Sequence, residues 1–381
     1  MGKECATLRG HIAKKGDKYY VVVYLGIGAD GKRKYKWHSG YAKKKDAEKA
    51  MPTILHQMNT GAYVETTEEK LSDYMQRWLE YKSQHVLATS MRTYEAIVRR
   101  YVTPSLGRLK LVDLKPYHLS KFYGELQKTL SARYVAQIHS VMHDALDRAL
   151  KWEIVARNVA DVVDAPSPKK MKFTVWSREQ ANRFITHPTV MRHRFYVVFL
   201  LALTTGMRQS EITGLRWRNI DLENGIIHVV EQQVYNKGTT DWGPVKSESG
   251  VRDIAIPEQV VTALRKHKAR QNQDRLMMQK AWIDRDLVVT RINGNWVSAA
   301  FLRMHWKHLV EIADVPYIRF HDLRHTHASM LLEMGEELKV IQEQLGHATI
   351  GITADTYAHV APSLKRGTAK KISEGLFGDR D

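Results

Sequence analysis

His321-Asp-Leu-Arg324-His-Thr-His-Ala-Ser329 is the stretch of this 381-residue sequence that says most about its fold and its chemistry. His321 and Arg324 are three residues apart, so on a helix they lie on one face. An arginine there suits a phosphate, because its planar guanidinium binds two oxygens at once and stays charged. The stretch therefore predicts a helix that presents a cation and an imidazole to a phosphate group.

Segments elsewhere in the chain carry residues of matching chemistry. Arg208 follows a glycine turn at the start of a predicted helix, His347 lies at the end of another, and Lys246 lies on a predicted hairpin. Tyr357 follows His347 by ten residues. A tyrosine hydroxyl can attack phosphorus to form a reversible phosphoester, provided that nearby cations favour its deprotonation. Together these residues predict cleavage of a DNA strand without a metal ion.

The histidines have a second interpretation as metal ligands. His321, His325 and His327 are close in sequence, but no carboxylate or thiol completes a ligand set and an arginine interrupts them. The single cysteine, Cys5, excludes an intramolecular disulfide and a Cys-rich zinc site. We expect no metal and no other cofactor. A metal-dependent nuclease or hydrolase is the alternative, and activity in EDTA would exclude it.

The order and spacing of these segments resemble the tyrosine recombinase (phage integrase) family over residues 66 to 365. HDLRHTHAS and LGH…TADTYAHV are close matches to the family's motifs. The family's signature falls here on Arg208, Lys246, His321, Arg324, His347 and Tyr357. Lys237 is an alternative to Lys246, because the hairpin varies in length among such proteins.

The resemblance implies a role for each of these residues. Arg208 and Arg324 clamp the scissile phosphate, and the two signature histidines support the clamp and manage the nucleophile's proton. Lys246 protonates the departing 5′-oxygen, and Glu211 orients an active-site arginine or histidine. Tyr357 forms a 3′-phosphotyrosyl link that conserves the phosphodiester's energy, so religation needs no ATP.

The fold class expected is multidomain α+β. Residues 1–62 predict a small β-ribbon domain with one helix, similar to the arm-binding domain of integrases that recognise two kinds of DNA site. Its second strand alternates basic and aromatic residues and could enter a major groove. The candidate DNA contacts there are Lys32, Arg33, Lys34, Lys36 and Trp37. The alternative is a solvated edge strand that its charges keep from aggregating.

Residues 66–165 predict a helical domain that binds the core site, with helices near 71–81, 90–102, 116–126 and 131–152. We expect the second helix to stop before Pro104. Arg92 and Arg99 are candidate phosphate contacts, although each alone is more often a solvated residue.

A Pro-containing linker at 166–170 leads to a mixed but mainly helical catalytic domain, residues 172–381, of the tyrosine recombinase type. Its predicted helices cover 177–186, 192–204, 209–215, 257–273, 298–312 and 322–334, and its predicted strands cover 226–230 and 251–256. Ser177 and Gln180 form a capping-box pattern at the first of these helices.

Charge and composition indicate the partner. Lys and Arg number 59 against 41 Asp and Glu, which gives a net charge of +18 and favours a polyanion such as DNA. No apolar stretch is long enough to span a membrane and the N-terminus lacks the apolar segment of a signal peptide, so we expect a DNA-associated protein in the cytoplasm of a bacterial host.

Exchange of two strands in each of two duplexes needs four active sites, which implies a homotetramer on double-stranded attachment sites of core and arm types. An excisionase or a DNA-bending host protein is an expected accessory. Near the C-terminus an apolar stripe predicts a helix that packs either on its own domain or on a neighbouring protomer, and the sequence leaves both open. The stripe comprises Leu364, Thr368, Ile372 and Leu376, with Phe377 beside them.

Two further functions are possible for a DNA-binding protein with these residues. A type IB topoisomerase shares the chemistry without partner exchange, and the β-ribbon domain and the tail helix argue against it. A catalytically silent DNA-binding regulator would have lost part of the signature, and all of its positions are filled.

Overall fold

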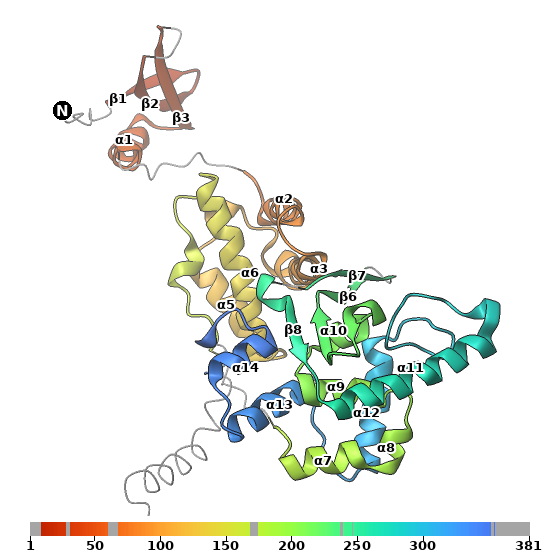
Figure 1. Ribbon diagram of the computed structural model, residues 1–381. Coiled ribbons are helices and arrows are strands. Elements are labelled where there is room, and N and C mark those ends of the chain that lie inside the picture. Colours follow the sequence, from red (N-terminus) through yellow and green to blue (C-terminus); the bar gives the residue numbers. More distant parts are fainter. Residues whose placement is uncertain are drawn as a thin grey trace, which may run out of the picture. The chain divides into compact units, whose positions relative to one another are not determined.

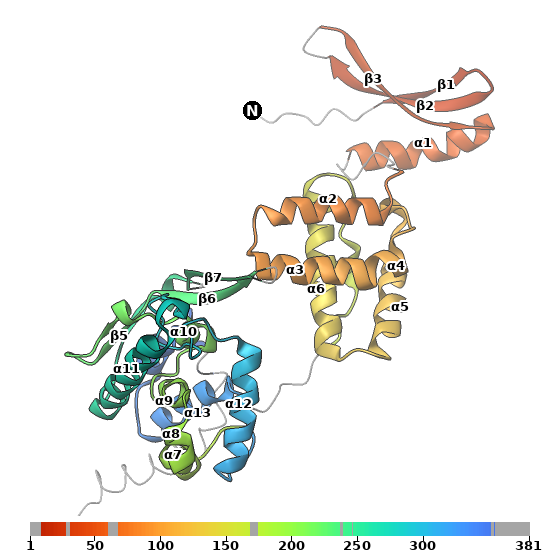
Figure 2. The same ribbon diagram turned by 90° about the vertical axis from the view of Figure 1, so that its right-hand side faces the viewer.

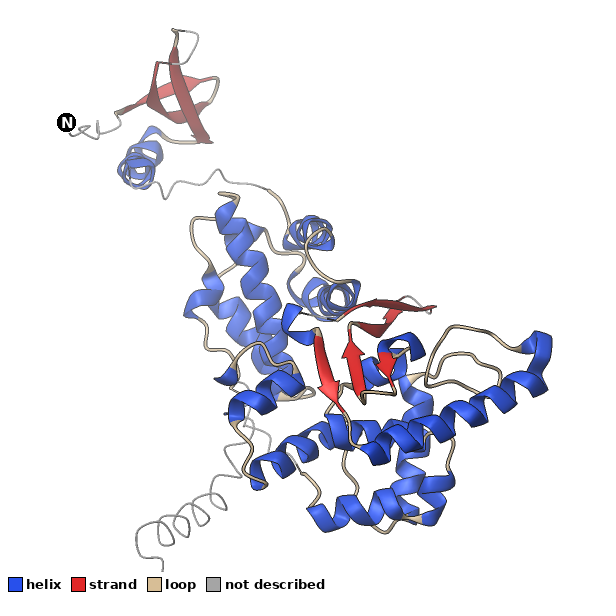
Figure 3. Cartoon of the chain, in the orientation of Figure 1, coloured by secondary structure: helices blue, strands red, loops and turns tan. Residues whose placement is uncertain are grey.

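The computed structural model describes residues 9–27, 31–59, 68–167, 174–236, 239–245, 247–351 and 354, and the chain divides into two compact units at residue 170 (Figure 1). Lys237, Lys246, Tyr357 and the apolar stripe of the tail lie outside the described residues. Helices predominate, and the strands form small separate sheets (Figure 3). None of the described helices is long and apolar enough to cross a membrane.

The N-terminal elements form a three-stranded antiparallel sheet in the order β1-β2-β3, with one helix against it (Figure 2). They are β1 (Gly10–Lys15), β2 (Lys18–Ile27), β3 (Arg33–Tyr41) and α1 (Lys44–Asn59). The predicted hairpin is confirmed as β2 and β3. The sequence did not predict β1, whose short segment GHIAKK alternates weakly and reverses at Gly16, where φ is +62°.

The pleat of β3 divides its candidate DNA contacts between two faces. Val21 and Val23 of β2 face α1, because they form a core with Ala47. Trp37 pairs with Val22 and so lies on the opposite, open face, where its ring contacts that of Tyr20 at 5.8 Å. By the same alternation Arg33 and Tyr35 share the open face, while Lys34 and Lys36 lie on the face that α1 covers.

The rest of the first unit is a helical bundle. Its elements are α2 (Leu71–Ser83), α3 (Ala88–Ile97), the π-helix η1 (Val98–Val102), α4 (Thr103–Leu106), η2 (Leu111–Asp113), α5 (Pro116–Gln127), α6 (Ala132–Lys151) and η3 (Val159–Val162). The core joins the apolar stripe of α2 to α6, and the Tyr74 hydroxyl donates to the Ala145 carbonyl at 2.5 Å. Ser131, where the fourth predicted helix begins, caps α6 through its hydroxyl.

The expected stop before Pro104 is wrong. The chain continues from α3 through a π-helical turn into α4, and the backbone N–H of Thr103 donates to the carbonyl of Val98. Pro104 then occupies the first turn of α4, where no intrahelical N–H is required. The wider π-turn supplies the geometry that an uninterrupted α-helix would deny to a proline.

The second unit surrounds one buried apolar helix, Tyr196–Thr205. Its helices are α7 (Arg178–Thr186), α8 (Pro188–Arg192), α9 (Tyr196–Thr205), α10 (Gln209–Gly214), η4 (Trp217–Asn219), η5 (Glu248–Gly250), α11 (Glu258–Met278), η6 (Gln279–Ala281), α12 (Ala299–Ile312), α13 (Asp322–Glu333) and α14 (Leu338–Leu345). Its strands are β4 (Ile220–Asp221), β5 (Ile226–Val229), β6 (Glu231–Asn236), β7 (Thr239–Pro244) and β8 (Arg252–Ala255), which form a sheet β4-β5-β8 and a hairpin β6-β7.

Most of the predicted elements have counterparts here. The helix predicted at 192–204 begins later, at Tyr196, because α8 ends at Arg192 and His193 is extended. The capping box of Ser177 and Gln180 is confirmed. Nearly all of α9 is buried, and an aromatic cluster that includes Phe184, Phe199 and Trp306 packs around it. This rigid helix fixes the turn that follows it, which carries the first residue of the signature.

Candidate functional site

The turn after α9 requires a glycine. Gly206 has φ of +66°, and a Cβ there would lie 2.7 Å from a side-chain carbon of His327 and from one of Leu345. The chain can therefore reverse here only without a side chain, and it does so against the elements that carry the other candidate residues. Two residues later Arg208 stands at the N-terminus of α10.

Glu211 holds Arg208 in place. The Arg208 backbone N–H donates to one Glu211 carboxylate oxygen at 2.9 Å, and its Nη1 donates to the other at 2.7 Å. The Glu211 side chain is only 1% exposed, and Arg252 Nη2 also donates to it at 2.9 Å. Burial raises the pKa of Glu211, but Arg252 and Arg208 outweigh burial and hold that pKa below its usual range. The carboxylate therefore stays charged and fixes both guanidinium groups.

Arg252 joins this pair to the end of α14. Its Nε donates to the carbonyl of Gln344 at 2.6 Å and its Nη1 to that of Gly250 at 2.9 Å. Arg208 Nη2 reaches the carbonyl of Gly346 at 3.2 Å. Because α14 ends at Leu345 with a left-handed glycine, these bonds set the direction in which the chain continues to His347.

Arg324 connects the same two turns from a third helix. It lies in α13 and is 3% exposed. Its Nη1 donates to the Gly206 carbonyl at 2.7 Å, and its Nη2 donates to the Leu345 carbonyl. Both carbonyls are neutral, so these two bonds do not offset the positive charge of the guanidinium, which can attract an anion. Arg208 and Arg324 thus form two fixed cations on one frame.

His321 and His347 lie close to these cations. The pKa of each is lowered by burial first, and Arg324 and Arg208 lower it further. For His347 the pKa falls to about 4. Both imidazoles are therefore neutral at pH 7 and can accept a proton or a hydrogen bond.

The other two histidines of the motif have different surroundings. His327 is buried, with Nδ1 2.8 Å from the Leu203 carbonyl and Nε2 3.1 Å from the Gln344 amide nitrogen. Both of its ring nitrogens are occupied, so it supports the frame and does not face a ligand. The ring of His325 contacts that of His321 edge to face at 5.4 Å. Among the residues described, no group of three or more His, Cys, Asp or Glu side chains could hold a metal ion.

The structure therefore brings together five residues that the sequence singles out: Arg208, Glu211, His321, Arg324 and His347. The candidate DNA contacts belong to the other unit. On the helical bundle Arg99 is exposed and Arg92 is half-buried, and both line a groove between α2 and α3 of about 860 Å³.

Known proteins share this organisation. The phage integrase family matches residues 175–363, an arm DNA-binding domain matches residues 11–58, and the N-terminal SAM-like domain of phage integrases matches residues 70–127. The chain is 28% identical to a XerC-like tyrosine recombinase of Caldanaerobacter subterraneus subsp. tengcongensis, over 95% of this chain and 97% of that protein.

The chain belongs to the tyrosine recombinase (phage integrase) family. Solved structures share the fold of such a recombinase. The Tn1549 transposon integrase in complex with transposon right-end DNA matches with a TM-score of 0.69 at 20% identity, over 80% of this chain and 99% of that one. A lambda integrase tetramer bound to a Holliday junction matches with a TM-score of 0.53 at 14% identity, over 90% and 96%.

Sequence reasoning missed two residues of this recombinase frame. Arg252 has the appearance of a surface residue beside Asp253, and only its contacts reveal that its side chain is 7% exposed. His327 was a candidate metal ligand, yet its partners are a carbonyl and an amide. No local pattern in the sequence distinguishes a buried arginine from a solvated one, because its partners come from distant segments.

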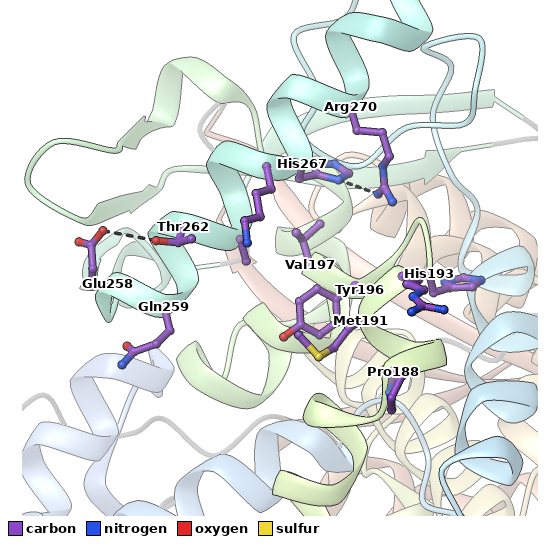
Figure 4. A pocket seen from close by; sticks show the side chains of 13 residues that line it. Pro188, Met191, His193, Tyr196, Val197, Glu258, Gln259, Thr262, His267 and Arg270 are labelled. Carbon is purple, nitrogen blue, oxygen red and sulfur yellow. Dashed lines mark hydrogen bonds between the residues drawn. The ribbon is translucent and has the colours of Figure 1, made fainter.

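A pocket elsewhere in the recombinase fold is not part of this frame. It has a volume of about 860 Å³ and lies between α8, α9 and α11 (Figure 4). His267 and Arg270 line it and are hydrogen-bonded at 3.0 Å. Arg270 also donates to the Arg194 carbonyl at 2.6 Å, so the half-buried Arg270 side chain has a structural role in linking α11 to the segment before α9. None of the residues of the arginine frame lines this pocket.

We expect Arg252→Leu to destabilise the second unit strongly. The change leaves the buried Glu211 carboxylate with one cation in place of two, and breaking a buried pair costs about 3–5 kcal/mol. Urea denaturation measures the loss. Arg265→Leu is the matched control, because it breaks an exposed pair with Glu258 that is worth about 0–1 kcal/mol. Equal losses in the two variants would contradict the assignment.

We also expect the second unit to lose stability as the pH falls from about 6.5 to about 4. Burial lowers the pKa of His325, His327 and His347 to about 4, whereas the unfolded chain titrates near 6.5. Between these values the unfolded state binds more protons, so acidification favours unfolding. Urea midpoints measured from pH 7 to pH 4.5 check this. His327→Asn, which cannot be protonated, should flatten the decline, and an unchanged slope would count against His327.

Proposed function

We propose that this chain is the site-specific recombinase of a phage or another mobile element, and that it cuts and rejoins DNA through a 3′-phosphotyrosyl link at Tyr357. The observation that carries the proposal is the frame of Arg208 and Arg324, which both donate to carbonyls at the end of α14, while Arg324 also donates to the Gly206 carbonyl in the turn before Arg208. Two fixed guanidinium groups beside neutral imidazoles suit the charge that develops on a phosphate during displacement.

The proposed reaction needs only the chain's own side chains. The Tyr357 hydroxyl oxygen attacks phosphorus while His321 or His347 takes its proton, and Arg208 and Arg324 neutralise the non-bridging oxygens. The bond from phosphorus to the 5′-oxygen breaks, and its electron pair takes a proton from Lys246 or Lys237. A 5′-hydroxyl of the partner strand reverses these steps and releases the tyrosine.

We propose three domains, at residues 1–62, 66–165 and 172–381. The three separate family matches and the separate hydrophobic cores support this division. The first would bind arm-type sites, and the other two would bind the core site. The lambda integrase relative is a tetramer on a Holliday junction, which supports a tetramer on DNA for this chain too. Action on the DNA of a bacterial host places the protein in its cytoplasm, with an excisionase or a DNA-bending protein as accessory.

For the first domain we propose that the open face of the sheet enters the DNA groove. α1 covers the other face. The open face carries aromatic rings with cations beside them, and Lys15 Nζ lies 6.0 Å from the centre of the Trp37 ring. Lys14, one residue away, lies over Tyr19 on the face toward α1.

The two adjacent lysines test this face. Lys15→Ala should weaken binding to arm-site DNA and reduce the salt dependence of binding by about one counterion, as expected for the loss of a phosphate contact. Lys14→Ala, on the covered face, should change both much less. Fluorescence anisotropy at several salt concentrations measures them. A larger effect from Lys14→Ala would contradict the proposed face.

A covalent adduct tests the function itself. The protein is mixed with duplex DNA that carries the attachment site of its own element and a nick beside the scissile phosphate, so that the departing strand diffuses away. The wild-type protein should accumulate a protein–DNA adduct in the presence of EDTA, and Tyr357→Phe should form none. Arg208→Ala and Arg324→Ala should each reduce its rate by about 100-fold or more, since each removes a fixed transition-state cation.

Other outcomes identify other functions. No adduct from the wild-type protein, or an adduct from Tyr357→Phe, would refute the proposal. Loss of activity in EDTA would indicate a metal-dependent nuclease. Relaxation of supercoiled DNA without recombinants would indicate a topoisomerase.

A further inference from the structure

The hairpin β6-β7 is fixed to the helix that begins at the active-site Arg208. Gly214, at the end of α10, lies so close to β6 that a Cβ would overlap the backbone nitrogen of Gln233. The Thr213 hydroxyl donates to the Gln233 side chain at 2.8 Å, and the Ser210 hydroxyl donates to that of Gln232 at 3.0 Å. Figures 1 and 2 both show the hairpin beside α10.

A single arginine then holds both strands of the hairpin. Arg216 Nε lies 3.0 Å from the carboxylate of Glu231, the first residue of β6. Its guanidinium carbon lies 5.3 Å from the centre of the Trp242 ring on β7. Its Nη1 donates to the carbonyl of Arg285 at 2.9 Å, and the Arg285 guanidinium also lies 5.3 Å from the Trp242 ring. Trp242 is thus a half-buried ring with two cations against it.

We infer that Trp242, held by Arg216 and Arg285, is a positioning residue for protonation of the leaving 5′-oxygen. Both candidate lysines belong to this hairpin in sequence: Lys237 joins β6 to β7, and Lys246 follows β7 by two residues. The phosphate clamp begins at Arg208 on α10. Trp242 would act on the lysine through the placement of β6 and β7, which Ser210, Thr213 and Arg216 hold beside α10. The inference rests on the proposed function.

The interaction is specific to an aromatic ring. Cations are attracted to the face of a ring, and an aliphatic side chain of similar size offers only apolar contact. The indole N–H of Trp242 has no hydrogen-bond acceptor within the described part of the chain. Trp242→Phe therefore removes no hydrogen bond and keeps the ring, while Trp242→Leu removes the ring.

A leaving group that needs no proton isolates this role. In DNA whose scissile phosphate carries a bridging 5′-sulfur, the P–S bond breaks and the electron pair leaves as a thiolate. With the ordinary 5′-oxygen the same pair must take a proton from the lysine. A displaced lysine therefore slows cleavage of the oxygen substrate and leaves cleavage of the sulfur substrate unaffected.

The experiment measures adduct formation by the full-length protein in single turnover, with saturating protein and nicked attachment-site DNA of each kind. Trp242→Leu and Arg285→Leu should slow the oxygen substrate by about 10- to 100-fold, as a small displacement of a catalytic group does. On the sulfur substrate both should return to within about 3-fold of the wild-type rate, because the general acid is no longer needed. Trp242→Phe should resemble the wild-type protein on both. Arg291→Leu is the control, because it removes an arginine that lies 5.1 Å from the Phe301 ring and not against Trp242.

Two results would overturn the inference. Trp242→Leu could match the wild-type rate on the oxygen substrate, or it could be equally slow on both substrates, which would mean that Trp242 serves binding or folding. Lys246→Ala and Lys237→Ala separate this from the proposed function. The acid is the lysine whose alanine variant regains the wild-type rate of adduct formation on the sulfur substrate. If neither variant regains that rate, neither lysine is the acid, and Trp242 has no acid to position. A wild-type protein that forms no adduct with either substrate refutes the proposed function, and the inference with it.

Discussion

The buried carboxylate of Glu211 is the constraint on which the active-site frame depends. A charge with 1% exposure is stable only if opposite charges surround it, and Arg208 and Arg252 supply them. Those arginines cannot relax toward solvent without leaving the carboxylate unpaired. Their remaining donors consequently hold the carbonyls of Gln344 and Gly346 in one arrangement. The charge of one buried carboxylate thus holds together the start of α10 and the end of α14, which are more than a hundred residues apart in the chain.

The frame also explains why its histidines are neutral. Positive charge collects where α10, α13 and α14 meet, and the partly buried imidazoles of His321 and His347 lie inside that field. A further positive charge there is unfavourable, so both rings remain bases. When a phosphate enters, its negative charge opposes the arginines and makes protonation of the rings easier. In the proposed reaction, binding of the phosphate would thus make His321 and His347 better proton acceptors.

The sequence predicted what local patterns determine. Most helices of the second unit lie close to their predicted ranges, and the capping-box pattern of Ser177 and Gln180 marked the start of one of them. The order and spacing of the signature residues along the chain revealed the catalytic motif.

The sequence did not predict the π-turn that carries the chain past Pro104, since that turn depends on how α3 and α4 pack. Nor did it reveal Arg252, because its partners lie in segments that only the fold brings near.

The glycine that ends α14 has a consequence for Tyr357, the proposed nucleophile. Gly346 turns the chain out of the helix at a point that three arginines anchor. Tyr357 is ten residues beyond His347, and an extended chain spans at most about 3.6 Å per residue. The hydroxyl is therefore tethered within roughly 36 Å of a fixed origin, plus the length of its side chain.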